Sequence, residues 1–340
     1  MRIAVMGAGG VGGCLGGLLA KSGNDVSLIA RGEHLEAIRE NGLKIIRAGS
    51  EFIVKVDATD NPLEVDQVDL ILFTVKTFQN RHVITSLKPL MGPKTSVITF
   101  QNGVESHEQL GALLGPNNIL PGAYWASSHI DSPGVISEDV GARISFGEID
   151  DTDSLRALEI RKIFRDAGIE TELSPDPLTV LWEKFVVLSA LAGITSAAQT
   201  RAKELLQFPD ARKMFCDAME EALAVGLAKG IELPATLVQD SLEYIDGLPD
   251  FQNSMHSDYE SGRPTELDAM SGSVIRLGKQ IGVQPPIHSY LYSVLLPHKD
   301  GVSGEEQLTY GAMTCKAVRL ACGILPTTLY PTDAFFKMKC

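Results

Sequence analysis

A glycine-rich segment near the start of the chain has the residue types and spacing that bind phosphate groups. It fits the pattern GxGxxG and lies between an apolar run at residues 2–6 and a helical pattern at residues 11–21. In such a loop Gly7 permits a tight turn, Gly9 lets a pyrophosphate approach the backbone at the positive end of the helix, and Gly12 lets helix and strand pack closely. The alternative is a tight turn without a ligand, but the position between strand and helix favours a dinucleotide. The residues predicted to bind this cofactor are Gly7, Ala8, Gly9, Gly10, Val11 and Gly12.

Two basic residues indicate which dinucleotide binds. The second predicted strand, at residues 25–30, is followed by Arg31, where NAD-binding sites usually carry a carboxylate. A guanidinium binds a 2′-phosphate with two hydrogen bonds, whereas a carboxylate would repel it. Lys76, after a strand at residues 69–75, adds positive charge at the same edge of the predicted sheet. The sequence therefore favours NADP(H) over NAD. The alternative interpretation of Arg31 and of Lys76 is an ordinary solvated side chain on the protein surface.

The elements that position these residues alternate between strand and helix. Such alternation predicts a parallel α/β sheet with right-handed crossovers, here a Rossmann-type doubly wound sheet. Further strands are expected within residues 119–150. The predicted strands cover residues 2–6, 25–30, 43–56, 69–75 and 96–100, and the predicted helices cover residues 11–21, 33–41 and 78–89.

The second half of the chain has a different pattern of predicted secondary structure. Residues 174–177 read Ser-Pro-Asp-Pro, and two prolines so close together end a helix or a central strand. Beyond them the patterns are helical, at about residues 178–198, 209–230, 234–246 and 264–281. We therefore expect a Rossmann NADP-binding domain over residues 1–174 and an all-α substrate domain over residues 175–340, which includes a C-terminal extension at 301–340.

Composition excludes several classes of function. The 340 residues carry 43 acidic and 30 basic side chains, a net charge of -13, which argues against a general nucleic-acid binder. Five cysteines without a CxxC pair predict neither a disulfide framework nor a zinc site, and no other metal-ligand spacing occurs. The longest apolar run, residues 185–198, is too short to span a bilayer. A cytoplasmic protein without a metal or a membrane partner is expected.

A set of short motifs, in matching order over about residues 1–295, resembles the ketopantoate reductase (2-dehydropantoate 2-reductase) family. The resemblance implies a Rossmann domain, a helical domain and a cleft between them. It also implies NADPH-dependent reduction of a 2-oxo acid to a 2-hydroxy acid, with 2-dehydropantoate as the first candidate. The motifs are GAGGVG at 7–12, Ala30-Arg31, Gly42-Leu43, Val75-Lys76, Gln101-Asn102-Gly103-Val104, Leu181-Trp182-Glu183-Lys184, Asn253-Ser254-Met255 with Asp258, and Arg263-Pro264-Thr265-Glu266.

The resemblance also implies roles for single residues. Hydride attack on a ketone places negative charge on its oxygen, which needs a proton donor or a fixed cation, and the family motif puts Lys184 in that catalytic role. Glu266 is the second implied catalytic residue, and it orients the ribose, the nicotinamide or Lys184. Asn102 is implied to contact the ribose or nicotinamide side of the cofactor. Ser254 is implied to bind the substrate carboxylate, with Asn253 as its support.

Each of these residues also has a structural alternative. Lys184 alone reads as a helix-surface lysine, and Glu266 as a first-turn carboxylate of a helix that Pro264 begins. Asn253 and Ser254 suit a loop or a helix cap. Asp258 is expected to pair with a cation of the cleft or to cap a helix.

The chain departs from the family pattern on one helix face. The family carries asparagines four and eight residues after the catalytic lysine, where this chain has Leu188 and Ala192, and a further asparagine aligns with Ala202. An apolar pocket does not hydrogen-bond a substrate hydroxyl. We therefore keep a less polar 2-oxo acid as an alternative substrate, and an NADP-binding sensor without activity as an alternative function. A homodimer is expected because the helical domain carries a long apolar tail.

Overall fold

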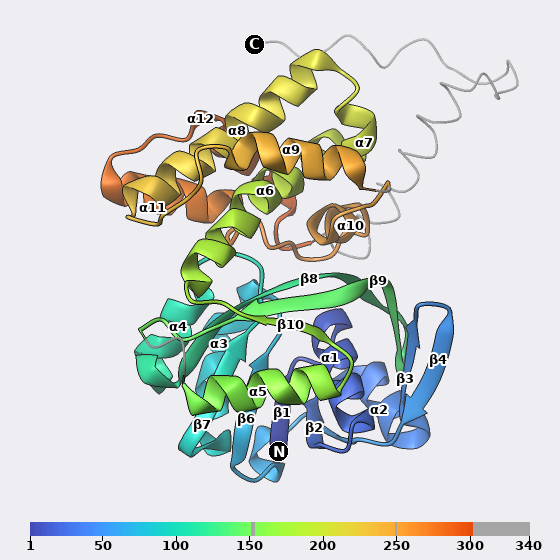
Figure 1. Ribbon diagram of the computed structural model, residues 1–340. Helices are drawn as coiled ribbons and strands as arrows, with labels where there is room; N and C mark the ends of the chain where they lie inside the picture. Colours follow the sequence, from blue (N-terminus) through green and yellow to red (C-terminus); the bar gives the residue numbers. More distant parts are fainter. Residues whose placement is uncertain (151–153, 249, 302–340) are drawn as a thin grey trace, which may run out of the picture.

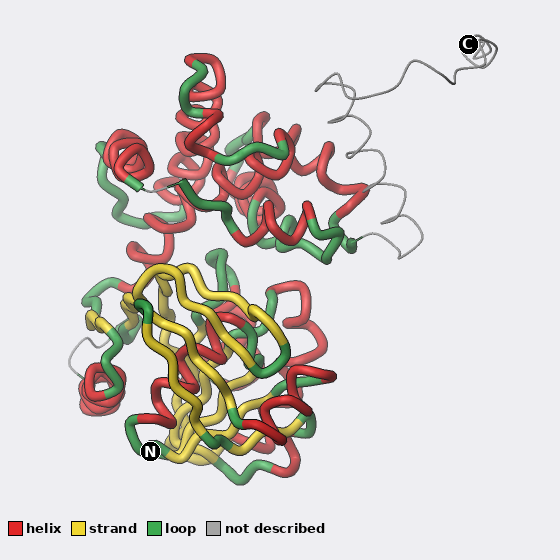
Figure 2. Tube along the Cα trace, turned by 90° about the vertical axis from the view of Figure 1, so that its right-hand side faces the viewer, coloured by secondary structure: helices red, strands yellow, loops and turns green. Residues whose placement is uncertain are grey.

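The computed structural model describes residues 1–150, 154–248 and 250–301, so all of the predicted extension at 301–340 except Gly301 lies outside the described residues. A sheet with flanking helices forms the N-terminal half, and a cluster of helices lies against one end of it (Figure 1). The view turned by 90° shows the same division, with the strands gathered in one half and only helices and loops in the other (Figure 2).

The sheet is of the predicted Rossmann type. β1 (Arg2–Met6) pairs in parallel with β2 (Asp25–Ile29) on one side and β6 (Val68–Phe73) on the other. Alternate side chains of β1 enter two separate apolar clusters, Ile3 and Val5 on one face and Ala4 and Met6 on the other. Both faces of a parallel strand are buried in this way when helices cover the sheet on both sides. The fold class predicted from the sequence is therefore confirmed.

The order of the strands is β4-β3-β9-β8-β7-β6-β1-β2-β5, with β10 paired to β9. The run of parallel strands from β5 to β8 is followed by a long antiparallel hairpin of β8 with β9, and β9 in turn pairs in parallel with β3 and β10. The predicted strand at 43–56 is a second antiparallel hairpin, because the chain turns at Ala48-Gly49 with positive φ angles of 49° and 74°. The remaining strands are β3 (Leu43–Arg47), β4 (Ser50–Val54), β5 (Asp57–Thr59), β7 (Met91–Thr99), β8 (Ile119–Ser132), β9 (Val135–Phe146) and β10 (Glu170–Leu173).

One helix of the sheet domain is shorter in the structure than the sequence predicted. The predicted helix at 78–89 is broken into α3 (Asn80–Val83) and flanking 3-10 segments, Thr77–Gln79 and Ile84–Leu90. Pro89 has no backbone N–H and cannot extend an α-helix there, so this prediction was wrong in helix type. The other helices of this domain are α1 (Gly10–Lys21), α2 (Gly32–Asn41), α4 (Ser106–Leu114) and α5 (Leu155–Asp166).

The helical domain is built around α6 (Pro177–Ala198). Asp176 caps this helix by accepting from Thr179 N–H, and Pro177 occupies its first turn. α6 is long and apolar enough to cross a membrane, but most of it is buried inside the domain, as in a core helix. Around it pack α7 (Ala202–Leu205), α8 (Pro209–Ala228), α9 (Leu237–Gly247), α10 (Ser254–Glu260), α11 (Ser271–Ile281) and α12 (Pro286–Leu295).

The helix predicted over 264–281 begins only at Ser271. Thr265 N–H donates instead to Lys299 O at 2.8 Å, which keeps this segment out of a helix. A tight turn follows, in which Glu266 O accepts from Ala269 and Met270 N–H. Glu266 therefore lies in a loop, and its reading as a first-turn helix carboxylate was wrong.

Candidate active site

The glycine loop connects β1 to α1 and is held by its backbone. Gly7 has a φ of 102°, and Gly7 and Ala8 N–H both donate to Ile29 O, at 3.2 and 3.1 Å. A Cβ on Gly12 would lie 2.2 Å from Gly7 O and 2.3 Å from Thr74 Oγ1, so only glycine fits where α1 packs on the sheet. A Cβ on Gly9 would meet nothing within 4 Å. The loop thus leaves open space at the N-terminus of α1, as a bound pyrophosphate requires.

The other predicted cofactor residues lie around this loop. Ala8 is buried, and Val11 is half-buried in the first turn of α1. A Cβ on Gly10 would lie 2.1 Å from Ser128 O, so this glycine lets the β8–β9 hairpin approach the loop. Arg31 is exposed and extended, directly after β2 and before α2, at the edge of the sheet that the sequence predicted.

Lys184 points from α6 to the boundary between the two domains. Its Nζ donates to Tyr124 O on β8 at 2.7 Å and to Asn102 Oδ1 at 3.1 Å. Burial lowers the pKa of Lys184 to about 8, and the negative charge of Glu266 opposes that shift. Lys184 is therefore a half-buried lysine that bonds across the domain boundary, and its reading as a helix-surface lysine was wrong.

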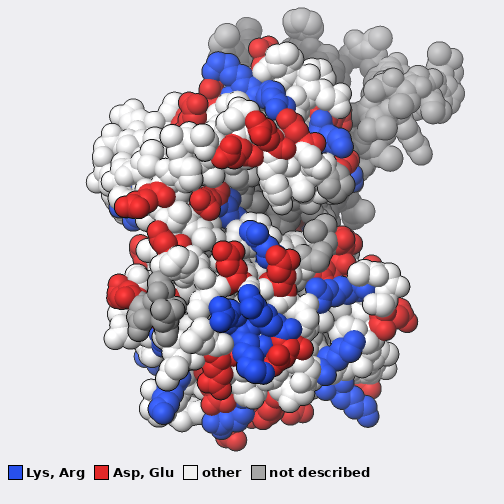
Figure 3. All heavy atoms as spheres, in the orientation of Figure 1, with Lys and Arg blue, Asp and Glu red and all other residues white. Residues whose placement is uncertain are grey.

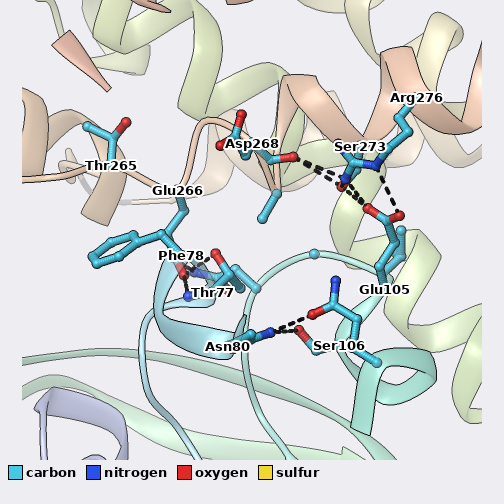
Figure 4. Close-up of a pocket in the computed structure, with 15 residues that line it drawn as sticks. Thr77, Phe78, Asn80, Glu105, Ser106, Thr265, Glu266, Asp268, Ser273 and Arg276 are labelled. Carbon is cyan, nitrogen blue, oxygen red and sulfur yellow. Dashed lines mark hydrogen bonds and ion pairs between the residues drawn. The ribbon is translucent and has the colours of Figure 1, made fainter. Parts of the chain in front are cut away.

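Glu266 approaches the same point from the helical domain. Its Oε1 accepts from Thr77 N–H at 2.9 Å and from Thr77 Oγ1 at 3.0 Å, and Figure 4 shows the two side chains pointing toward each other. Its Oε2 accepts from Asn102 Nδ2 at 3.4 Å. Asn102 thus bridges the two charged groups, because its amide oxygen accepts from Lys184 while its amide nitrogen donates to Glu266.

Lys76 adds a second cation to this cluster. Its Nζ lies 2.7 Å from Asp258 Oδ2 and 3.8 Å from Glu266 Oε2. Burial alone would lower the pKa of Lys76, but the two carboxylates outweigh burial and raise it. Asp258 also accepts from Arg263 Nε at 2.9 Å. The expected pairing of Asp258 with a cleft cation is therefore confirmed.

Asn253 and Ser254 take different positions at the start of α10. Asn253 is buried and caps the helix, because its Oδ1 accepts from His256 N–H at 3.0 Å. Its Nδ2 donates to Thr195 Oγ1 at 2.5 Å, which ties α10 to α6. The capping alternative thus describes Asn253 in this structure. Ser254 is exposed, and its contact with a substrate carboxylate stays a prediction.

A cavity of ≈ 170 Å³ lies next to the cluster, between the domains. Asn102 and Glu266 line one part of it, and Glu105 closes the other by accepting from Ser273 Oγ at 2.5 Å and pairing with Arg276 (Figure 4). The face shown in Figure 3 is mixed in sign, with acidic and basic side chains close together on both domains. Among the described residues, no group of three or more His, Cys, Asp or Glu could hold a metal ion.

Two family models cover nearly all of the described chain. Residues 3–151 match the model described as "Ketopantoate reductase PanE/ApbA", and residues 176–299 match its "C terminal" counterpart. The chain belongs to the ketopantoate reductase family. This ketopantoate reductase homologue is an oxidoreductase that acts on CH–OH groups, of a family that reduces 2-oxo acids.

Known proteins resemble this family member over most of its length. A 2-dehydropantoate 2-reductase of Mesorhizobium japonicum is 30% identical over 313 residues, which cover 84% of this chain and 94% of that protein. The crystal structure of the Geobacter metallireducens 2-dehydropantoate 2-reductase is 31% identical, with a TM-score of 0.83 over 87% of this chain and 99% of that chain. A D-mandelate dehydrogenase structure with NADH and anilino(oxo)acetate is 25% identical, with a TM-score of 0.82 over 88% and 98%.

The departures from the ketopantoate reductase pattern lie close to Lys184. Leu188 and Ala192 follow Lys184 by one and two turns of α6, on the same side of that helix. Leu188 is half-buried, whereas Ala192 is 1% exposed. Both pack among apolar residues of the helical domain. Apolar side chains thus occupy the helix face that leads away from the Lys184 ammonium group.

Three residues of the candidate site had no assignment from the sequence. Thr77 donates two hydrogen bonds to Glu266, and the one feature of the sequence that could have indicated this role is the position of Thr77 directly after Lys76. Tyr124 contributes a backbone carbonyl to Lys184, for which side-chain patterns give no signal. His34 lies against the glycine loop, with Nε2 2.9 Å from Ala8 O, and it follows the predicted cofactor residue Arg31 by three positions.

Proposed function

We propose that this chain reduces a 2-oxo acid to a 2-hydroxy acid with NADPH, with 2-dehydropantoate as the first candidate substrate and pantoate as its product. The observation that carries the proposal is the hydrogen-bonded cluster of the half-buried Lys184 and Asn102 with the buried Glu266 at the carboxyl edge of the parallel sheet. The glycine loop follows β1 at this same edge, and ligands of such sheets bind there. The family membership favours this enzyme over a sensor without activity.

The residues around the glycine loop fit a phosphorylated dinucleotide. The open space at Gly9 suits the pyrophosphate, and the exposed guanidinium of Arg31 suits a 2′-phosphate after β2. When bound, NADPH supplies the hydride that reduces the substrate ketone. Lys76 is a second candidate for the anionic cofactor, and in this structure it is held by Asp258 and Glu266.

Lys184 holds the proton that the reaction consumes. An ammonium group with a pKa of about 8 is charged at neutral pH and still acidic enough to give a proton to an oxyanion. Tyr124 O and Asn102 Oδ1 accept two of its N–H bonds and leave the third for the ketone oxygen. The positive charge also stabilises the negative charge that develops on that oxygen. Glu266, through Asn102, fixes the geometry of this donor.

The apolar face of α6 favours a second candidate substrate. Leu188 and Ala192 offer no hydrogen bond to a substrate hydroxyl, so a 2-oxo acid with an apolar side chain fits this face better than ketopantoate does. The ternary structure of the related D-mandelate dehydrogenase contains NADH and anilino(oxo)acetate, a 2-oxo acid derivative with an aromatic group. An aromatic or branched 2-oxo acid is therefore the alternative to 2-dehydropantoate.

A substrate panel tests the proposed function. The purified protein is mixed with NADPH or NADH and with 2-dehydropantoate, branched 2-oxo acids and aromatic 2-oxo acids, and the absorbance of reduced nicotinamide is followed. We expect oxidation of NADPH with at least one of these acids, and the ratio of kcat/KM values names the substrate. Tight NADPH binding without oxidation across the panel would overturn the proposal in favour of the sensor.

A double variant separates the two candidate substrates. Leu188→Asn with Ala192→Asn restores the asparagines of the family pattern on the Lys184 face. If the natural substrate is apolar, this variant lowers kcat/KM for the apolar acid and raises it for 2-dehydropantoate. The exposed pair Phe208→Asn and Tyr244→Asn is the matched control for two added asparagines.

A homodimer in the cytoplasm remains a prediction, and light scattering during size-exclusion chromatography measures the oligomeric state.

A further inference from the structure

His34 lies between the glycine loop and the turn of the β8–β9 hairpin. Its Nε2 is 2.9 Å from Ala8 O, and Gly134 N–H donates to its Nδ1 at 3.0 Å. Its own helix, α2, begins directly after Arg31. One imidazole thus connects the pyrophosphate loop, the hairpin turn and the helix that follows the residue expected to bind the 2′-phosphate.

The two contacts define the state of the ring. Because Gly134 N–H donates to Nδ1, that nitrogen carries no hydrogen, and the neutral ring has its hydrogen on Nε2. Nε2–H therefore donates to Ala8 O. Burial lowers the pKa of His34, which favours this neutral form, while the bond to the Ala8 carbonyl opposes the shift. His34 is an oriented donor to the loop.

The bond to Ala8 O decides where the next amide points. A trans peptide is planar, and its C=O and N–H point in opposite directions. Since Ala8 O is turned toward His34, Gly9 N–H is turned to the other side. Gly9 precedes the first turn of α1, and a Cβ on it would meet nothing within 4 Å. The orientation imposed by His34 thus gives a phosphate an unobstructed approach to the backbone at Gly9.

We propose that His34 is a positioning residue for the nicotinamide cofactor, which orients the Ala8–Gly9 peptide so that Gly9 N–H donates to the pyrophosphate. The glycines allow the loop to adopt its shape, and His34 selects one peptide orientation within that freedom. The inference rests on the proposed cofactor site, but it does not depend on which 2-oxo acid is reduced.

Two substitutions separate the two hydrogen bonds of the ring. His34→Gln places an amide N–H near the position of Nε2 and keeps the donor to Ala8 O. His34→Asn places an amide oxygen near the position of Nδ1 and keeps the acceptor for Gly134 N–H. His34→Ala removes both bonds, and His82→Ala, at an exposed histidine of α3, is the matched control.

The readout is the Kd of NADPH and of NADH, measured by quenching of intrinsic tryptophan fluorescence, together with Tm and kcat at saturating cofactor. We expect His34→Ala and His34→Asn to raise both Kd values about tenfold, and His34→Gln about threefold or less. Both cofactors weaken equally because they share the pyrophosphate, and kcat at saturation stays within about twofold. A purely structural role predicts instead that affinity follows Tm in all three variants.

Two results would overturn the inference. One is wild-type affinity in His34→Ala, and the other is equal affinity in His34→Gln and His34→Asn. If His34→Ala fails to fold, the comparison of the Gln and Asn variants still decides. A wild-type protein that binds neither NADPH nor NADH would instead remove the proposed function, and a wild-type protein that binds NADPH without reducing any 2-oxo acid would leave the His34 result valid.

Discussion

The glycine loop and the Lys184 cluster lie at the same edge of the sheet, yet different parts of the chain build them. The loop is a run of neighbouring residues, 7–12, and the proposed contacts with a cofactor come from its backbone. The cluster joins side chains that are up to 190 positions apart, from Lys76 to Glu266, and across two domains. The loop motif can be recognised from neighbouring residues in the sequence, whereas the side chains of the cluster come together only when the two domains pack against each other.

The two regions also differ in what holds them. The loop depends on sterics, because Gly12 has no room for a Cβ and Gly7 needs a positive φ. The cluster depends on charge balance, because it joins two half-buried lysines, Lys76 and Lys184, to two buried carboxylates, Asp258 and Glu266. A buried charge is costly unless it is paired, so the loss of one partner affects the others. We therefore expect substitutions in the loop to alter cofactor affinity and substitutions in the cluster to alter turnover.

The largest effect is expected for Lys184→Ala. This change removes the proton donor and the fixed cation, so kcat falls about 10³-fold, while the Kd of NADPH changes by less than about twofold. Steady-state kinetics and fluorescence titration measure the two quantities. Lys162→Ala, at an exposed lysine paired with Asp166 on α5, should behave as wild type. Turnover within about threefold of wild type would remove Lys184 from its role.

The pH profile is the next test of the cluster. Lys184 donates a proton only while it is charged, and its pKa is about 8. The rate is therefore expected to be flat at neutral pH and to fall as pH rises through 8, by tenfold per unit well above that value. In Lys184→Arg the guanidinium keeps its proton, so a lower rate without this alkaline limb is expected. An unchanged limb in the arginine variant would assign it to another group.

Arg31→Ala tests the loop side of the comparison. Loss of a charge-assisted bond to the 2′-phosphate should raise the Kd of NADPH about tenfold to 100-fold and leave that of NADH unchanged. The turnover at saturating NADPH should stay near that of wild type. Arg39→Ala is the matched control, because Arg39 lies on α2 and donates to Ala58 O. Equal loss of affinity for both cofactors would contradict the assignment.

The smallest effect is expected for Thr77→Val. The variant keeps the shape and the backbone N–H of Thr77 but loses the hydroxyl that donates to Glu266. We expect kcat to fall about fivefold at an unchanged Kd for NADPH, and Thr77→Ser to restore it. Thr85→Val, at an exposed threonine of the same domain, is the control. A change in the Kd of NADPH without a change in kcat would contradict the expectation that the cluster affects turnover and the loop affects cofactor affinity.

Local chemistry explains which parts of the fold were predictable. The alternation of apolar strands and helices identified the Rossmann sheet, and the prolines around Asp176 marked the start of α6. The helix expected at 264–281 failed in its first half, because Thr265 bonds to Lys299, far along the chain. The single strand expected at 43–56 failed because a two-residue turn at Ala48-Gly49 reverses it. In both places the local sequence favoured a continuous helix or strand, but a hydrogen bond to a distant residue or a tight turn interrupted it.

The sequence by itself determined the glycine loop between β1 and α1 and the position of Arg31 after β2, and its resemblance to a family singled out Lys184 and Glu266. These follow from short motifs, since a turn that only glycine adopts and a strand that precedes it are local properties. Only the tertiary structure decided that Tyr124 O and Thr77 hold Lys184 and Glu266, that Lys76 faces Asp258 and that His34 holds the loop. A backbone carbonyl or a contact between distant segments has no sequence signature, because tertiary packing creates it, within the sheet domain for His34 and between the two domains for the other contacts.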